Sequence, residues 1–247
     1  MQIADCGLRI GDCGDCGLRI ADLGFGNGIR TVTLNSQSAI HNPQSAIGKS
    51  AIRNPQSAIT ESAICNPQSE IPVEIEVGCG NGRYLRRAAC ERPGHLFIGI
   101  ERSLSYARKA QDRMVKYGVG NVRIVRADAS CFLAERIAPE SVHTLHVYFT
   151  DPWPKNRHAK RRLFQTPFLE TIHRILRPGG QVFIKVDLYW YFEEIFCRFE
   201  QSPWFTVAAC GMETDPDRDL YEITGFEHKA LVKKGAVFTL VVRRCTD

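Results

Sequence analysis

The chain has 247 residues, of which 44% are hydrophobic and 24% charged, a balance typical of a soluble globular protein. No apolar run approaches the roughly 20 residues of a membrane-spanning helix, and the first residues lack the layout of a secretory signal, so we expect a cytoplasmic protein. The net charge of +5 belongs to residues 71–247, which hold 27 Lys and Arg against 21 Asp and Glu and therefore favour a polyanionic partner.

Residues 1–70 are repetitive. Asp-Cys-Gly-Leu-Arg-Ile occurs at 5–10 and at 15–20, and Asn-Pro-Gln-Ser begins at 42, 54 and 66. This twelve-residue repeat is shorter than solenoid repeats and has few large apolar residues, so we predict a disordered low-complexity segment followed by one folded domain at 71–247. The near-identical copies resemble translated repetitive DNA, which suggests a biological start near Ile71.

Two features of the repetitive segment are interpreted as coincidental. The stretch Gly-Phe-Gly-Asn-Gly at 24–28 has the form of a nucleotide loop, but no helix or acidic strand end is predicted after it. Cys13 and Cys16 form the one Cys-x-x-Cys pair among ten scattered cysteines, so we predict reduced thiols and no metal site.

From Ile71 onward, strand and helix patterns alternate. Strands are predicted at 73–77, 96–100, 122–125, 142–149, 181–186, 206–209 and 237–242, and helices at 83–92, 104–117, 129–137, 164–176 and 190–200. Strands that alternate with helices predict an α/β fold, here a Rossmann-like, doubly wound, mostly parallel seven-stranded sheet. In such a sheet, ligands bind beyond the carboxyl ends of the strands, where the strand order reverses.

The first strand ends in a glycine loop that predicts a cofactor site. Gly78, Gly80 and Gly82 allow positive φ angles and a close approach to a ligand, while Arg83 stands where a dinucleotide loop has its third glycine. This favours S-adenosylmethionine, which has no pyrophosphate, over NAD. Glu76 precedes the loop, where it can face the cationic methionine end of that cofactor.

Two further acids end the next two predicted strands. Glu101 comes about twenty residues after the glycines, where a carboxylate can accept both hydroxyl groups of a ribose. Asp128 ends the third strand, where it can meet the exocyclic amine of an adenine. Each acid alone could instead be a solvated strand end or a helix cap. The three in order after a glycine loop predict a cofactor site.

The fourth strand runs into Asp151-Pro-Trp-Pro and then a basic run. The two prolines stiffen this loop and aim Asp151 at the cofactor site. The run at 155–162 contains five Lys and Arg, of which Arg157 is a candidate substrate contact. Exposed basic runs are often only solvated, but one beside a cofactor site suits phosphate contacts.

At this point the sequence resembles the bacterial tRNA (guanine-N7-)-methyltransferases, a family of class I S-adenosylmethionine-dependent enzymes. The resemblance covers nearly all of 71–247 and is carried most specifically by Phe-Thr-Asp-Pro-Trp-Pro-Lys-Asn-Arg-His at 149–158 with Lys-Arg-Arg at 160–162. Glu-Val-Gly-Cys-Gly at 76–80, Gly-Ile-Glu at 99–101, Val-Asp at 186–187 and Thr-Gly-Phe-Glu at 224–227 also match. Residues 1–70 match nothing in the family.

The resemblance implies an assignment of roles. It implies that Asp151 is the catalytic residue and that the target is a guanosine in the tRNA variable loop, position 46 by tRNA convention. The implied cofactor residues are Glu76, Glu101, Asp128 and Asp151, and the implied substrate residues include Lys155, Asp187, Thr224, Gly225, Phe226 and Glu227.

The chemistry of N7 methylation fits these residues. Guanine N7 has a free lone pair and no proton, so the reaction needs alignment of the reacting atoms more than a general base. Asp151 or Asp187 can accept hydrogen bonds from the N1–H and amino group of guanine, a division of roles that stays open. The target guanine in the variable loop must turn out of its stacked position to react. Trp153 can stack on that base or simply cover the end of the fourth strand.

Two other functions remain as alternatives. A Rossmann methyltransferase acting on another RNA, a small molecule or a protein explains the glycine loop and the acids but not the adjacent basic run. A non-catalytic RNA-binding protein that keeps the fold is disfavoured by the three intact acids. The oligomeric state and the tRNA species accepted do not follow from the sequence.

Overall fold

The computed structural model describes residues 71–215 and 225–246. The predictions for residues 1–70 and for Thr224 therefore lie outside the described residues. Within the described part, no helix combines the length and apolar character needed to cross a membrane.

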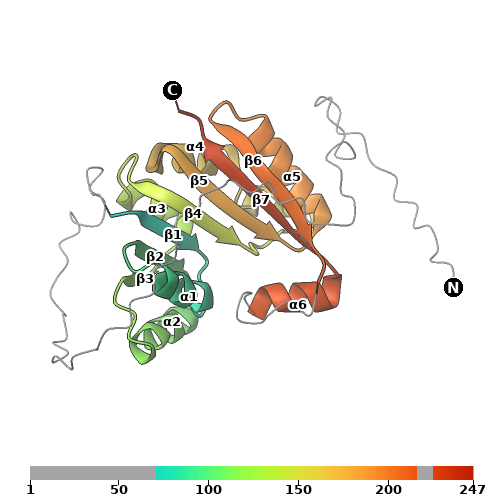
Figure 1. Ribbon diagram of the computed structural model, residues 1–247. Helices are drawn as coiled ribbons and strands as arrows, with labels where there is room; N and C mark the ends of the chain where they lie inside the picture. Colours follow the sequence, from blue (N-terminus) through green and yellow to red (C-terminus); the bar gives the residue numbers. More distant parts are fainter. Residues whose placement is uncertain (1–70, 216–224, 247) are drawn as a thin grey trace, which may run out of the picture.

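The described chain forms one seven-stranded sheet with helices on both faces (Figure 1). The strand order is β3-β2-β1-β4-β5-β7-β6. β1 to β5 run parallel, whereas β7 is antiparallel to both of its neighbours. This confirms the predicted mostly parallel, doubly wound sheet, with the order reversing beside β1.

The predicted elements lie close to the observed ones. The strands are β1 (Val73–Val77), β2 (Leu96–Glu101), β3 (Val122–Arg126), β4 (Val142–Tyr148), β5 (Leu176–Val186), β6 (Phe205–Glu213) and β7 (Val237–Arg244). The helices are α1 (Arg83–Glu91), α2 (Leu104–Lys116), α3 (Ala129–Arg136), the 3-10 helix η3 (Asn156–Arg161), α4 (Thr166–Ile175), α5 (Tyr189–Glu200) and α6 (Gly225–Lys234).

Two helices, η3 and α6, were not predicted. Both are mostly polar, and α6 buries only Glu227, Ala230 and Leu231, so neither presents the apolar stripe from which a helix is inferred. The helix predicted at 164–176 also ends earlier, because Leu176 already pairs with Val142 of β4. Residues 177–180 then bulge out of the ladder before Gln181 pairs with Thr144.

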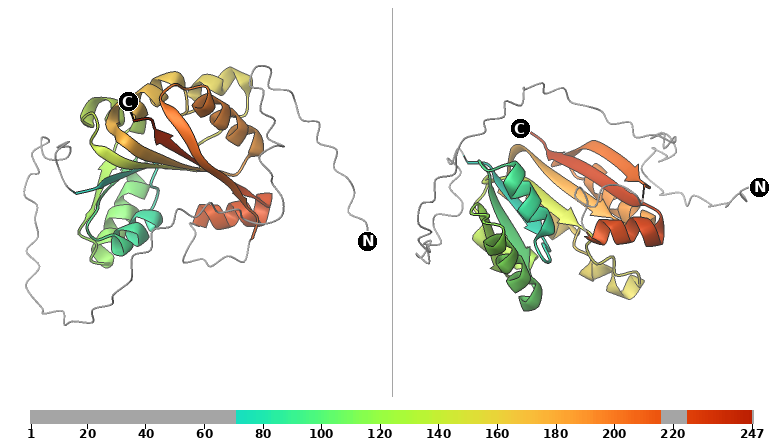
Figure 2. Two further views of the ribbon diagram at one scale, coloured as in Figure 1. Left: turned by 45° about the horizontal axis from the view of Figure 1, so that its top comes forward. Right: turned by 60° about the horizontal axis from the view of Figure 1, so that its bottom comes forward.

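The two faces of the sheet differ in chemistry. Side chains alternate along a strand, so Ile75, Leu145 and Ile184 share one face, where they join the large apolar core with α3, α4 and α5. Glu76 and its neighbours on adjacent strands, His146 and Gly99, share the other face. Figures 1 and 2 show α1, α2 and α6 on this second face and α4 and α5 on the first.

Gly99 allows α1 to pack directly on the second face. A Cβ atom at Gly99 would lie 2.4 Å from Leu85 Cδ1 and 2.8 Å from Cys79 Sγ, both of them buried. Such a contact requires the backbone or these side chains to move. The glycine therefore sets how closely the helix after the glycine loop approaches the strand that ends in Glu101.

We predict that Gly99→Ala lowers the free energy of unfolding by about 1–3 kcal/mol, the usual cost of overfilling a packed core. Urea unfolding followed by circular dichroism measures this change. Gly211→Ala on β6 is the matched control, because a Cβ there meets no atom within 4 Å. Equal midpoints for the two variants would contradict the packing role of Gly99.

Candidate active site

The glycine loop lies at the carboxyl end of β1, in the left-handed backbone region that only glycine adopts without strain. The φ angles of Gly78, Gly80 and Gly82 are 70°, 54° and 69°. A Cβ at Gly78 or Gly80 would meet no protein atom within 4 Å, so the space beside the loop is open to a ligand. Gly82 instead packs on α2, where a Cβ would come within 2.9 Å of Met114 Cε.

Glu101 fixes this loop to the end of β2. One carboxylate oxygen accepts a hydrogen bond from the Gly80 N–H at 2.9 Å, and the other accepts from the Ser103 N–H at 2.7 Å. Each oxygen keeps a second lone pair. The carboxylate can therefore hold the loop and still accept hydrogen bonds from a ligand's hydroxyl groups.

Glu76 is the polar group of the site that the protein leaves unsatisfied. Its side chain is buried, and among the described residues its Oε2 atom has no hydrogen-bond partner. Burial, together with the negative charge of Glu101, raises the pKa of Glu76 well above its ordinary value. A cation placed beside this carboxylate would remove both penalties.

Without a ligand, we predict that Glu76→Gln stabilises the protein, and increasingly so as the pH rises. Because the pKa of Glu76 is raised in the folded state, its stabilising contribution is complete below the ordinary pKa of about 4.3 and is lost as pH rises toward the folded value. Glutamine does not titrate and so avoids this loss. Urea midpoints from pH 5 to 8 measure the difference, with the exposed Glu170→Gln as control. A difference that stays constant with pH would contradict the account.

Asp128 lies where predicted, at the end of β3, and also caps a helix. Its side chain accepts a hydrogen bond from the Cys131 N–H at 3.2 Å at the start of α3. The carboxylate is exposed to solvent. The helix-cap interpretation is thus realised, and the contact with an adenine remains a prediction.

The loop after β4 carries Asp151 in an unusual backbone conformation. Phe149 and Trp153 on either side of it have φ angles of 54° and 43°, which are strained for residues with a Cβ atom. Phe149 is held by its N–H, which donates to the Lys185 carbonyl at 2.8 Å, and by apolar packing against α6. Asp151 itself is exposed at this edge.

Arg162 holds the Asp151 loop in place. Its guanidinium donates to the carbonyl oxygens of Pro152 at 3.0 Å and Trp153 at 3.1 Å, and it pairs with Glu194 of α5. It also lies 5.0 Å from the Trp190 ring centroid. Arg162 is therefore a structural member of the basic run, whereas Lys155, Arg157, Lys160 and Arg161 are exposed.

We predict that Arg162→Ala lowers the free energy of unfolding by about 1–3 kcal/mol, because it leaves the Pro152 and Trp153 carbonyl groups without their side-chain donor and removes one of the two arginines that pair with Glu194. Thermal unfolding measures the loss, and limited proteolysis should show faster cleavage within 150–162. Lys160→Ala, which removes an exposed cation from the same run, is the control. The same melting temperature for both variants would refute the role of Arg162.

On the substrate side, two predicted residues take part in ion pairs. Asp187 Oδ2 lies 3.0 Å from Lys234 Nζ at the end of α6, and the buried Glu227 pairs with Lys185 of β5. These two pairs dock α6 against the end of β5. Sequence reasoning missed both lysines, although a lysine within the apolar strand pattern at 182–186 was a usable signal for a buried acidic partner.

The comparisons with known proteins agree with this geometry. The family described as "Putative methyltransferase" matches residues 70–240. The tRNA (guanine-N(7)-)-methyltransferase of Thermotoga maritima is 34% identical over 172 residues, which cover 70% of this chain and 54% of that protein. That of Streptococcus suis is 34% identical over 185 residues, covering 72% of this chain and 81% of that protein. This chain belongs to the tRNA (guanine-N(7)-)-methyltransferase family.

Solved structures support the fold. The 16S rRNA (adenine(1408)-N(1))-methyltransferase of Catenulisporales acidiphilia, solved with its cosubstrate SAM, has a TM-score of 0.53 at 16% identity. The match covers 77% of this chain and 93% of that one. At this identity the likeness shows a shared class I methyltransferase fold. The chain also spans only about half the length of the Thermotoga relative.

The site of this family member brings together most of the predicted residues. The glycine loop, Glu76, Glu101 and Asp151 come from the carboxyl ends of β1, β2 and β4, which share one edge of the sheet. Gly225 lies close to the loop, because a Cβ there would be 3.1 Å from Nη1 of Arg83. Phe226 is 64% exposed at the start of α6, unlike the buried Glu227 beside it.

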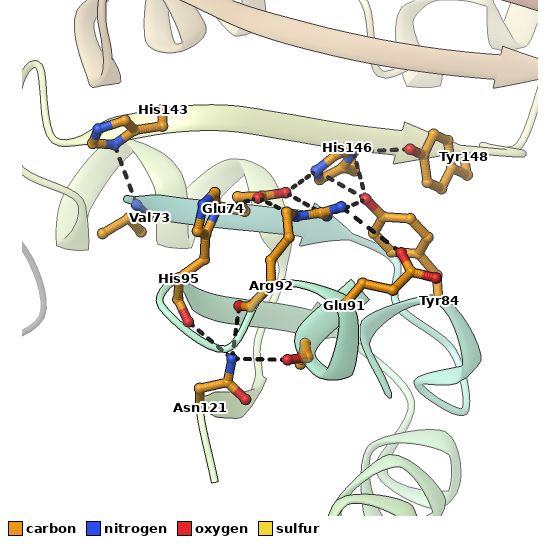
Figure 3. Close-up of polar contacts among 11 residues, drawn as sticks. Val73, Glu74, Tyr84, Glu91, Arg92, His95, Asn121, His143, His146 and Tyr148 are labelled. Carbon is orange, nitrogen blue, oxygen red and sulfur yellow. Dashed lines mark hydrogen bonds and ion pairs between the residues drawn. The ribbon is translucent and has the colours of Figure 1, made fainter. Parts of the chain in front are cut away.

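A buried hydrogen-bond network lies behind the site, and the sequence analysis did not find it (Figure 3). His146 Nε2 lies 2.8 Å from a Glu74 oxygen and its Nδ1 lies 2.8 Å from the Tyr148 hydroxyl. Burial lowers the pKa of His146, so the neutral ring can donate to Glu74 and accept from Tyr148. Arg92 donates to both oxygens of Glu74 at 3.0 and 3.1 Å.

The ionisation of this network differs from that of Glu76. Burial raises the pKa of Glu74, but the hydrogen bonds and charges of its partners outweigh burial and lower it to about 2. Two acids two residues apart on β1 thus have opposite pKa shifts, because Glu74 has His146 and Arg92 as partners and Glu76 has neither. The alternation of Glu with Val and Ile at 73–77 was the signal for two acids on one face of a strand.

Cys79 is a packing residue within the loop. It is buried, and burial together with the charges of Glu76 and Glu101 raises the pKa of its thiol. The thiolate needed of a nucleophile is therefore disfavoured. Among residues 71–215 and 225–246, no group of three or more His, Cys, Asp and Glu side chains is arranged to hold a metal ion.

Proposed function

We propose that this chain transfers a methyl group from S-adenosylmethionine to N7 of a guanosine in tRNA, with residues 71–247 as the methyltransferase domain and the cytoplasm as its location. The observation that carries the proposal is the buried, unpaired Glu76 carboxylate beside a glycine loop in a chain of this family. The target that fits the family resemblance is the variable-loop guanosine, position 46.

The residues present fit this cofactor. Glu76, whose Oε2 atom lacks a protein partner, would hold the cationic methionine end, and Glu101 would accept hydrogen bonds from the ribose while it holds Gly80. Asp128 is available to the adenine amine at the end of β3. When bound, S-adenosylmethionine supplies a methyl group on a positively charged sulfur.

The residues of the chain act mainly by positioning. Guanine N7 carries a lone pair and no proton, so no side chain has to remove one before the transfer. Either Asp151, on its strained loop, or Asp187, at the end of β5, accepts hydrogen bonds from the N1–H and amino group of guanine, and thereby rejects adenine. Lys234 orients the Asp187 carboxylate at 3.0 Å.

The exposed members of the basic run suit the tRNA backbone. Lys155, Arg157, Lys160 and Arg161 stand at the mouth of the site, where they neutralise phosphates near the target loop. The target base must leave its stack at a cost of a few kcal/mol. Trp153, which is partly buried and lies 4.9 Å from the Arg161 guanidinium, and the exposed Phe226 are the aromatic rings available to it.

The test is methyl transfer from labelled S-adenosylmethionine to unmodified tRNA by the full chain, with the product mapped by strand scission at 7-methylguanosine. We predict label at the variable-loop guanosine and none when that base is replaced by adenosine. Asp151→Asn should lower kcat about 100-fold, the order of loss from a misplaced reactant. Glu170→Gln, which changes an exposed residue of α4 outside the site, should leave kcat unchanged. Transfer to a different nucleotide, a small molecule or a protein would replace the proposal with the corresponding alternative.

A further inference from the structure

The positive charge of the domain is concentrated in the segment that contains α1, β2, α2 and β3. Residues 83–126 contain eleven Lys and Arg against three Asp and Glu, a net charge of +8. Residues 71–247 together carry only +6, so the rest of the domain is slightly acidic. The basic run at 155–162 is therefore one of two basic regions.

On α2 this charge forms a stripe. Tyr106, Lys109, Arg113 and Lys116 follow one another at spacings of three, four and three residues, which places them on one side of a helix. Tyr117, just after the helix, extends the stripe to about 16 Å. Asp112 is the one acidic residue in α2, and it lies beside the stripe rather than in it.

Aromatic rings alternate with the cations. Tyr106 and Tyr117 are 43% and 50% exposed, large values for tyrosines. The Arg86 guanidinium of α1 lies 4.8 Å from the Tyr117 ring centroid, and Lys109 Nζ lies 5.3 Å from that of Tyr106. Exposed aromatic rings beside cations are the arrangement by which proteins hold bases and phosphates of RNA together.

The stripe is joined to the cofactor loop. Arg113 Nε donates to the carbonyl oxygen of Asn81 at 2.8 Å, between the second and third loop glycines. α2 begins directly after β2, at the same carboxyl edge of the sheet as the site, while η3 follows β4 on the other side of β1. The site therefore has a basic region on each side.

We propose that this α1–α2 basic stripe is a second contact surface for tRNA, which binds backbone phosphates and unpaired bases outside the target loop. Its members are Arg86, Tyr106, Lys109, Arg113, Lys116 and Tyr117. The inference rests on the proposed function for the identity of the RNA. Charge complementarity with a polyanion, and the rings that a purely solvated helix face does not need, select RNA over an acidic protein.

The experiment compares two double variants of the full chain that remove the same number of charges. Lys109→Gln with Lys116→Gln removes two cations of the stripe. Arg108→Gln with Arg243→Gln is the control, because Arg108 points about 100° around α2 from Lys109 and Arg243 lies on β7. Direct tRNA binding is measured from 50 to 300 mM salt, together with methyl transfer and S-adenosylmethionine affinity.

We expect the stripe variant to bind tRNA roughly tenfold more weakly and to lose about two from the slope of log affinity against log salt, while the control loses less than one. Its KM for tRNA should rise with kcat and cofactor affinity unchanged. Tyr106→Leu should weaken binding several-fold without changing the slope, because stacking releases no counterions.

The two proposals fail in different ways. If the stripe variant and the control have the same affinity and salt slope, the stripe is not an RNA surface, whatever the transfer assay shows. If wild type binds tRNA through the stripe but methylates no guanosine, the proposed reaction fails and the surface stands. No binding of tRNA by wild type overturns both.

Discussion

The carboxylate of Glu76 is the constraint on which the site depends. Burying an ionised group without a partner is costly, and Glu101 nearby raises that cost further. Among the described residues no side chain donates to Glu76 Oε2, whereas Arg92 donates to both oxygens of the equally buried Glu74 two residues earlier. This difference between neighbours on one strand is the reason that we propose a ligand as the missing partner of Glu76.

The sheet separates the apolar core, on one face, from the polar groups around Glu76, on the other. One face carries Ile75, Leu145 and Ile184 in a continuous apolar core that stabilises the domain. The other face carries the His146 network and the Lys185–Glu227 pair, in which the polar groups have partners, and beside them Glu76, whose Oε2 atom has none. α1 packs closely on this face at Gly99, where a Cβ atom would lie 2.4 Å from Leu85 Cδ1. The side chains that form the large apolar core and the acids proposed to bind the cofactor therefore lie on opposite faces of the same strands.

Much of the fold followed from the sequence, because apolar periodicity and glycines report local structure directly. β1 was predicted with its observed ends, and the acids at the ends of β1, β2 and β3 followed from the strand order. The helix α6, the partners of Asp187 and Glu227, and the clamp by Arg162 did not. The helix lacks an apolar stripe, and the pairs of Arg162 with Glu194 and of Asp187 with Lys234 join residues far apart in the chain, which no local pattern records. Lys185 within an apolar strand was the one local signal for the partner of Glu227.

Proton release on cofactor binding tests the central claim most directly. At pH 6, calorimetric titration with S-adenosylmethionine in buffers of different ionisation enthalpy counts the protons that leave the protein. If the cofactor's positive charge is the partner of Glu76, binding lowers the raised pKa of that carboxyl and wild type releases protons. Glu76→Gln should bind far more weakly and release none. Equal affinity and equal proton release in the two proteins would contradict the account.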